Sequence, residues 1–273
     1  MMQALSHPYL QNALAAGLLV ALLAACVGYF IILRGAAFAT HALAQIGFAG
    51  AAGAVLLGID PLVGLIAFAV LGATGLGVLS SRERTSDVMT ALVLVAALGT
   101  GALFLALAHS YAANVYALLF GTIVGITRSD VIAIGIATAV IAVALGTLSR
   151  PLLFATIARE TAQTRGVPVA TLDIAFLIVV GLAVAVTVPI VGTLLIYSLA
   201  IGPTAAATRL TARPAQTIPL GFAFAAFAVV AGIALAYATT WPVGFFIALM
   251  SALEYLVARF LSRRPAAARK SIL

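Results

Sequence analysis

The sequence predicts an all-α polytopic membrane protein with about nine transmembrane helices, eight being the alternative. Of its 273 residues, 64% are hydrophobic and only 8% are charged, whereas an ordinary soluble domain carries roughly 25% charged residues. Apolar stretches of about 20 residues, enough to cross a bilayer as a helix, recur along the chain. This composition excludes a soluble enzyme, a disordered chain and a nucleic-acid-binding domain. The net charge of +7 is therefore interpreted as a signal of membrane topology.

The predicted spans fill the chain and leave no room for a soluble domain, so residues 1–273 form a single transmembrane domain. The spans are Asn12–Leu33, Ala37–Gly58, Leu62–Leu79, Val88–Ala108, Val131–Leu148, Leu172–Val188, Gly192–Ala207, Ile218–Ala238 and Pro242–Leu261. A further apolar piece, Val115–Ile126, is too short to span and is interrupted by Gly121 and Gly125. We expect it to be a re-entrant or broken helix, which must lie against protein or water because lipid cannot satisfy its backbone groups.

Basic residues set the expected orientation. With the basic tail, residues 262–273, placed in the cytoplasm, thirteen of the 14 Lys and Arg residues face the cytoplasm and only Arg128 lies outside. This strong bias follows the positive-inside rule and predicts an external N-terminus.

The longest hydrophilic stretch, about residues 149–170, is cytoplasmic in this topology. Within it, Leu152–Arg165 interleaves apolar and charged residues and is followed by Gly166 and Pro168, a pattern typical of a short helix and its end. Composition alone leaves two alternatives open. The helix either lies on lipid headgroups or docks a cytoplasmic partner.

Two common site chemistries are absent from the sequence. The only lysine is Lys270, so the run Gly72–Gly77 is no phosphate-binding loop, and its small residues favour close helix packing instead. ATP hydrolysis is therefore expected in a separate subunit. The only cysteine is Cys26, which excludes an internal disulfide. Leu23–Cys26 resembles a lipoprotein cleavage site, but Met1–Asn12 has no basic residue of the kind a secretory signal needs.

Ionisable residues within spans are costly and commonly functional. All but one of the carboxylates fall at or beyond the ends of spans: Asp60, Glu83, Asp87, Asp130, Glu160 and Asp173. The exception, Glu254, is expected to snorkel or to pair near the cytoplasmic face, with Arg259 close by. A proton-coupled carrier normally needs a buried carboxylate, so this distribution favours a transporter driven by a separate ATPase.

The second span carries the most informative polar pair. His41 and Gln45 are four residues apart and share one helix face, and Gly47, Gly50 and Gly53 would let another backbone approach closely. An imidazole and an amide oxygen can contribute to the coordination of a divalent transition metal. The alternative is a histidine that is satisfied by a neighbouring helix.

The order of several short motifs resembles the membrane subunits, or permeases, of ABC importers for zinc, manganese and iron(II). The resemblance covers roughly Gly17–Arg259. Its motifs include Asp87 before the fourth span, Leu119-Phe120-Gly121, a coupling segment with three matching residues, Val191-Gly192 followed by Pro203, and Pro242 with Gly244 at the start of the last span. The three matching residues of the coupling segment are Glu160, Ala162 and Gly166.

Two positions depart from the family pattern. The family usually has Asp and then His four residues later in the second helix, where this chain has His41 and Gln45. The spacing is kept while the charge is lost, which puts the identity of the metal in doubt. The coupling segment usually begins Asp-Pro, where this chain has Ala158-Arg159.

The resemblance also implies which other subunits this chain works with. It implies a permease in the inner membrane that works as a homodimer or pseudo-dimer, two cytoplasmic ATPase subunits on the coupling segment, and an extracytoplasmic metal-binding protein that delivers substrate. Transport would be by alternating access, with no cofactor bound to this chain and zinc as the expected cargo. The alternatives are a permease for a metal chelate or vitamin, a stand-alone secondary carrier, and a structural scaffold.

Overall fold

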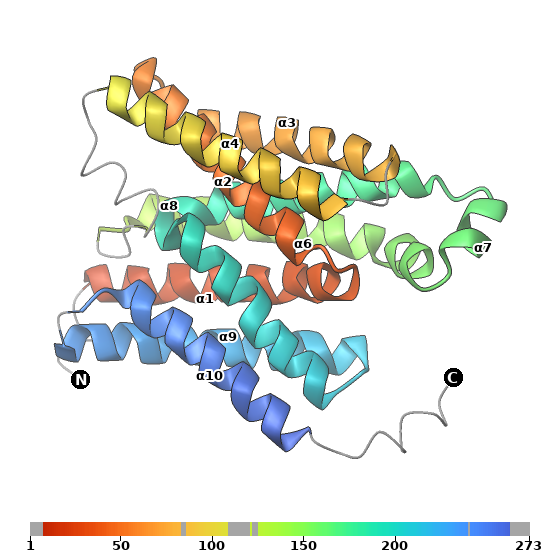
Figure 1. Ribbon diagram of the computed structural model, residues 1–273. Helices are drawn as coiled ribbons and strands as arrows, with labels where there is room; N and C mark the ends of the chain where they lie inside the picture. Colours follow the sequence, from red (N-terminus) through yellow and green to blue (C-terminus); the bar gives the residue numbers. More distant parts are fainter. Residues whose placement is uncertain (1–7, 83–85, 109–120, 122–124, 240, 263–273) are drawn as a thin grey trace.

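The computed structural model describes residues 8–82, 86–108, 121, 125–239 and 241–262. In this part of the chain every regular element is a helix, as predicted (Figure 1). The helices are α1 (Pro8–Leu33), α2 (Ala37–Leu56), α3 (Pro61–Arg82), α4 (Ser86–Leu107), α6 (Arg128–Ile157), α7 (Arg159–Thr164), α8 (Val169–Leu210), α9 (Pro214–Thr239) and α10 (Val243–Leu261).

The described helices include eight that are long and apolar enough to cross a membrane. The first four predicted spans correspond to α1–α4, the fifth to α6, and the last two to α9 and α10. The sixth and seventh predicted spans are the two halves of one element, α8, and the sixth candidate span of the structure ends within it at Thr193. The expected re-entrant piece, Val115–Ile126, lies outside the described residues except for Gly121, Gly125 and Ile126.

The bend inside α8 occurs at Gly192, where φ is 79° and ψ is 162°. That conformation is essentially restricted to glycine, and Pro189 just before it removes one helical hydrogen bond. In Figure 1, α8 runs from the side of α7 to the opposite side of the bundle, reverses, and returns diagonally toward α9. The chain therefore crosses the bundle twice within this one element, as the two predicted spans require.

Local signals explain where several helices begin. Thr127 caps α6 in a capping box: its hydroxyl accepts from the Asp130 N–H, and the Asp130 carboxylate accepts from the Thr127 N–H. Asp60 accepts from the N–H of Leu62 at 2.7 Å, and Pro61 occupies the first helical position of α3.

The helices divide into an inner and an outer group. In α1, α2 and α8 most residues of the spans are buried, reaching 72% in α2, whereas α4, α6 and α10 bury less than a quarter. Glycines permit the tight packing of α2. A Cβ placed on Gly50 would lie 2.2 Å from the carbonyl oxygen of Gly64 in α3. The close approach expected from the glycines of the second span is therefore confirmed at Gly50.

The glycine-rich run of α3 also packs against neighbouring helices. A Cβ on Gly72 would contact Ile46 of α2 at 2.8 Å, and one on Gly77 would contact Ile174 of α8 at 2.7 Å. The interpretation of this run as a packing motif is confirmed.

The predicted coupling helix, Leu152–Arg165, is too long at its start. Residues Leu152–Ile157 belong instead to the end of α6, which continues through Pro151. The chain breaks at Ala158, and α7 covers only Arg159–Thr164. Gly166, at φ +78°, follows α7 as predicted, and Pro168 immediately precedes α8.

Candidate functional site

The polar pair of the second span lies on α2, the most enclosed helix. Gln45 is 3% exposed and His41 is half-buried. The Nδ1 atom of His41 and the Oε1 atom of Gln45 are both inaccessible to solvent and have no hydrogen-bond partner among the described residues. A buried polar atom without a partner is costly, so these two atoms are available to a ligand that the helices around them do not supply.

One residue of α8 that sequence reasoning missed, Tyr197, contacts His41 of this pair. The Tyr197 ring lies 4.8 Å from the His41 ring, centroid to centroid. Thr193 is one turn before Tyr197, fully buried, and its hydroxyl has no partner among the described residues. A polar tyrosine in an otherwise apolar span was the available signal.

The side-chain atoms here that could coordinate a metal ion are uncharged and few. Within the described ranges no three His, Cys, Asp or Glu side chains come close enough together to hold a metal ion. One chain therefore offers at most an imidazole nitrogen, an amide oxygen and hydroxyl oxygens here. Such a set suits brief coordination of a passing divalent ion rather than tight storage.

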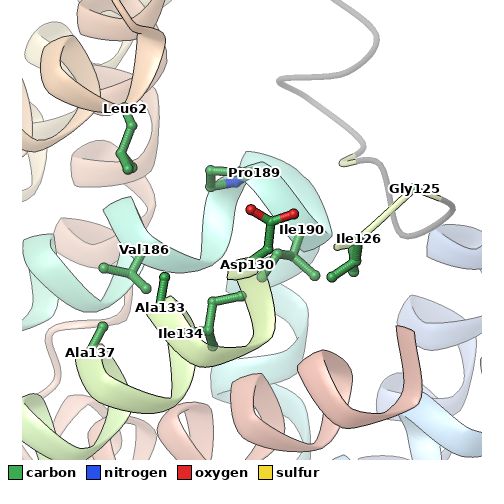
Figure 2. A pocket seen from close by; sticks show the side chains of 10 residues that line it. All are labelled: Leu62, Gly125, Ile126, Asp130, Ala133, Ile134, Ala137, Val186, Pro189 and Ile190. Atoms are coloured by element: carbon green, nitrogen blue, oxygen red, sulfur yellow. The ribbon is translucent and has the colours of Figure 1, made fainter. Parts of the chain in front are cut away.

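A separate hollow lies at the end of the bundle where α8 bends. This pocket of about 380 Å³ lies between the starts of α3 and α6 and the bend itself, and neither His41 nor Gln45 lines it. Figure 2 shows the Asp130 carboxylate near Pro189, among mostly apolar side chains. That carboxylate already accepts hydrogen bonds from Thr127, so it serves as the cap of α6.

Gly121, one of the residues that match the family motif, contacts the same bend. Its φ is +74°, and a Cβ there would lie 2.2 Å from the carbonyl oxygen of Ile190. Only glycine fits this position. Phe120, its neighbour in the motif, lies outside the described residues.

The other family-matching residues have identifiable positions. Asp87 is exposed in the first turn of α4, and Pro203 is buried within α8. Pro242 precedes α10, where a Cβ on Gly244 would lie 2.4 Å from the Leu195 side chain. These positions account for packing and helix starts, and their roles remain predictions.

The predicted coupling residues occupy both faces of α7. Glu160 is exposed in its first turn, whereas Ala162 is fully buried against the bundle. Gly166, also exposed, terminates the segment. An outward-facing carboxylate over a buried small residue is an arrangement that a docking partner can contact.

Glu254 does not behave as expected. Both of its carboxyl oxygens are buried and have no partner in the described part of the chain, and no ion pair joins it to Arg259 there. The expectation of a snorkelling or paired carboxylate is therefore wrong, because its place in α10 turns the side chain toward the bundle.

The fold and the site define a polytopic permease. Its least hydropathic span, α2, is also the most enclosed by protein. That span carries two potential metal-ligand atoms, on His41 and Gln45, that have no hydrogen-bond partner among the described residues. The chain belongs to the ABC 3 transport family, whose family model matches residues 6–262. It is thus the membrane subunit of an ABC transporter, and the ATPase is a separate subunit. A stand-alone secondary carrier is excluded by this membership.

Individual relatives match nearly the whole chain. The manganese transport system membrane protein MntC of Halalkalibacterium halodurans is 28% identical over 95% of this chain and 89% of its own length. The high-affinity zinc uptake system membrane protein ZnuB of Haemophilus influenzae is 24% identical over 92% and 97%. The structure of PsaBC from Streptococcus pneumoniae in complex with Fab has a chain that is 26% identical, with a TM-score of 0.87 and 98% of both chains covered.

Proposed function

We propose that the chain is the permease of an importer for divalent transition-metal ions and that zinc is its preferred cargo. The observation that carries this proposal is the pair of buried, unpartnered donor atoms, His41 Nδ1 and Gln45 Oε1, one helical turn apart on α2. Manganese and zinc in the names of the relatives support the class of cargo.

The donor chemistry favours zinc within that class. Imidazole suits zinc and other late first-row ions, while manganese prefers carboxylate and other oxygen ligands. Gln45 supplies an amide oxygen where the family usually has an imidazole, and His41 replaces the usual carboxylate. In a homodimer with the path between the two copies, the facing helices would provide two imidazoles and two amides.

Manganese is the second candidate. It occurs in the names of more of the matched relatives than zinc does. The two candidates differ in the ligands they need, so substitutions at positions 41 and 45 separate them.

The proposal also includes the orientation of the chain in the membrane and the subunits that it contacts on each side. α7 and the ends of α1, α6 and α8 lie on one side of the bundle (Figure 1). Arg34, Arg159, Arg165 and Arg209 occur at these elements, whereas Arg128 starts α6 on the opposite side. The positive-inside rule then assigns the α7 side to the cytoplasm. There α7 would contact ATPase subunits, and a metal-binding protein would deliver cargo from the other side.

The test is metal accumulation in cells that lack their own high-affinity uptake, with expression of each variant measured. We expect His41→Ala to reduce zinc uptake at least about tenfold, equivalent to about 1.4 kcal/mol of barrier height, while the complex stays assembled. Thr74→Ala is the matched control, because the Thr74 hydroxyl bonds within its own helix and its loss should change nothing.

A double variant tests the choice of metal. His41→Asp with Gln45→His restores the usual family pair and should widen uptake toward manganese, because it adds a carboxylate ligand. If His41→Ala transports zinc as well as the parent chain does, His41 is a packing residue and the site assignment is wrong. Efficient manganese uptake by the unmodified chain, with little zinc uptake, would favour the second candidate.

A further inference from the structure

A partly buried ion-pair cluster joins three elements on the α7 side of the bundle. The carboxylate of Asp173, near the start of α8, accepts from two arginines at once. Arg34 Nη2 donates to Oδ1, and Arg159 Nη2 donates to Oδ2 at 2.8 Å. Sequence reasoning placed Asp173 only at the end of a span and gave it no role.

The two arginines differ in how firmly they are held. The Arg34 side chain is 10% exposed, donates to the Thr156 hydroxyl at 3.3 Å, and stacks 5.0 Å from the centroid of the Phe176 ring. Burial lowers the pKa of the Arg34 guanidinium, and Asp173 opposes that shift. Arg159 is 51% exposed and bonds only to Asp173 among the described residues. Arg34 is thus the fixed side of the cluster, and Arg159 is the side that can move.

The positions of these residues make the cluster a link between two functional elements. Arg159 is the first residue of α7, and Arg34 lies in the short turn between α1 and α2. That turn is held by its own backbone bonds, including Ala36 N–H to Ile31 O at 2.9 Å. α2 begins at Ala37, and His41 is in its second turn.

The ion pair between Arg159 and Asp173 is not needed merely to hold the helices together. α7 already buries Ala162 against the bundle, and the Arg34–Asp173 pair joins α1 to α8 without help from α7. Within the described residues, the Arg159–Asp173 pair is the polar side-chain contact from α7 to the rest of the fold. A displacement of α7 would therefore be passed from Arg159 to Asp173 and then to Arg34, which lies just before the helix that carries His41 and Gln45.

We propose that Asp173 is a positioning residue that couples movement of α7 to α2 through Arg159 and Arg34. This inference rests on the proposed function, since it assumes that an ATPase moves α7 and that α2 lines the path. The prediction is that breaking the Arg159 link separates ATP hydrolysis from transport.

The experiment uses the complete transporter in liposomes and measures ATP hydrolysis and zinc uptake on the same samples. Because Arg159 belongs to α7, ATPase association and hydrolysis per assembled complex are measured first. In Arg159→Gln, zinc moved per ATP hydrolysed by the assembled complex should fall about five- to tenfold, toward the lower end of the roughly 5–150-fold range of coupling between sites. Arg159→Lys keeps the charge and should restore most of the ratio. Arg165→Gln, on an exposed arginine just after α7, is the matched control and should match the parent.

A second measurement does not depend on the cargo. Ala37→Cys in a Cys26→Ser background places the only thiol at the start of α2, where its labelling rate should change on addition of ATP. That change should disappear in the Arg159→Gln background. An unchanged ratio of zinc to ATP with an unchanged ATP response of the thiol would overturn the inference, as would parallel losses of hydrolysis and uptake that leave the ratio intact. Failure of the parent to move zinc or manganese would instead refute the proposed function, and the thiol response would still test the link.

Discussion

Replacing Gly50 with alanine should push α2 away from α3. The added Cβ would lie 2.2 Å from the carbonyl oxygen of Gly64 and 2.5 Å from Cβ of Phe68. Ordinary contact begins near 3.4 Å, so the helices must separate by about 3.4 − 2.2 = 1.2 Å at this point. Neither obstacle is the flexible end of a side chain, so the clash cannot be relieved locally.

The expected cost follows from this geometry. Overpacking of a well-filled interior typically costs about 1–3 kcal/mol, and chains of this size lose about 2–4 °C of unfolding midpoint per kcal/mol. We therefore expect thermal unfolding of the purified protein in detergent to shift down by about 2–12 °C. Zinc uptake should fall as well, because Gln45 lies five residues before Gly50 on the displaced helix.

The control is Gly75→Ala on α3, where a Cβ would meet nothing within 4 Å. It removes a helical glycine without a clash, so the midpoint should hold or rise. The double variant Gly50→Ala with Gly64→Ala should cost less than the sum of its parts, because one separation relieves both contacts. Equal midpoints for Gly50→Ala and Gly75→Ala would refute the packing of α2 on α3 described above.

Three further predictions concern topology, docking and the bend. In a Cys26→Ser background, a membrane-impermeant thiol reagent added outside cells should label Ser129→Cys but not Thr161→Cys; the reverse pattern would invert the topology. Glu160→Lys reverses an exposed charge on α7 and should weaken ATPase association in pull-downs without reducing membrane insertion, so full association and full uptake would discard α7 as the docking element. Gly192→Ala forces a side chain into a conformation that costs about 1–3 kcal/mol. Its unfolding midpoint should drop, and an unchanged midpoint would contradict the observed bend.

The helical architecture could be predicted because the apolar stretches have the length of a bilayer and end at recognisable residues. Asp60 lies just before α3, at the end of a span as expected, and Gly166 follows α7, as the sequence indicates. The bend at Gly192 was marked only as a boundary between two spans. Whether two spans form one continuous element depends on backbone angles at a single glycine, which composition does not encode.

The site was only partly predictable for a different reason. His41 and Gln45 are four residues apart, so helical periodicity places them on one face. Tyr197 approaches His41 from a helix more than 140 residues away, and that pairing depends on how α8 folds back. Asp173 and Arg34 likewise meet only through tertiary packing. The orientation of Glu254 was mispredicted because it depends on which side of α10 packs against α8 and α9, and that contact exists only in the folded protein.

The poor hydropathy of α2 has a consequence for how the protein is made. This helix is the least hydropathic of the eight candidate spans and the most enclosed by protein. Lipid alone is a poor solvent for a segment that contains His41, Gln45 and Thr40, so α2 should not remain stable as a separately inserted helix. It packs against α3 and α4, which follow it in the chain, and against α8, which emerges from the ribosome much later. During biogenesis, α2 must therefore be sheltered by its immediate neighbours or by the insertion machinery until α8 arrives, and truncated chains that end before residue 169 should be preferred targets of membrane quality-control proteases.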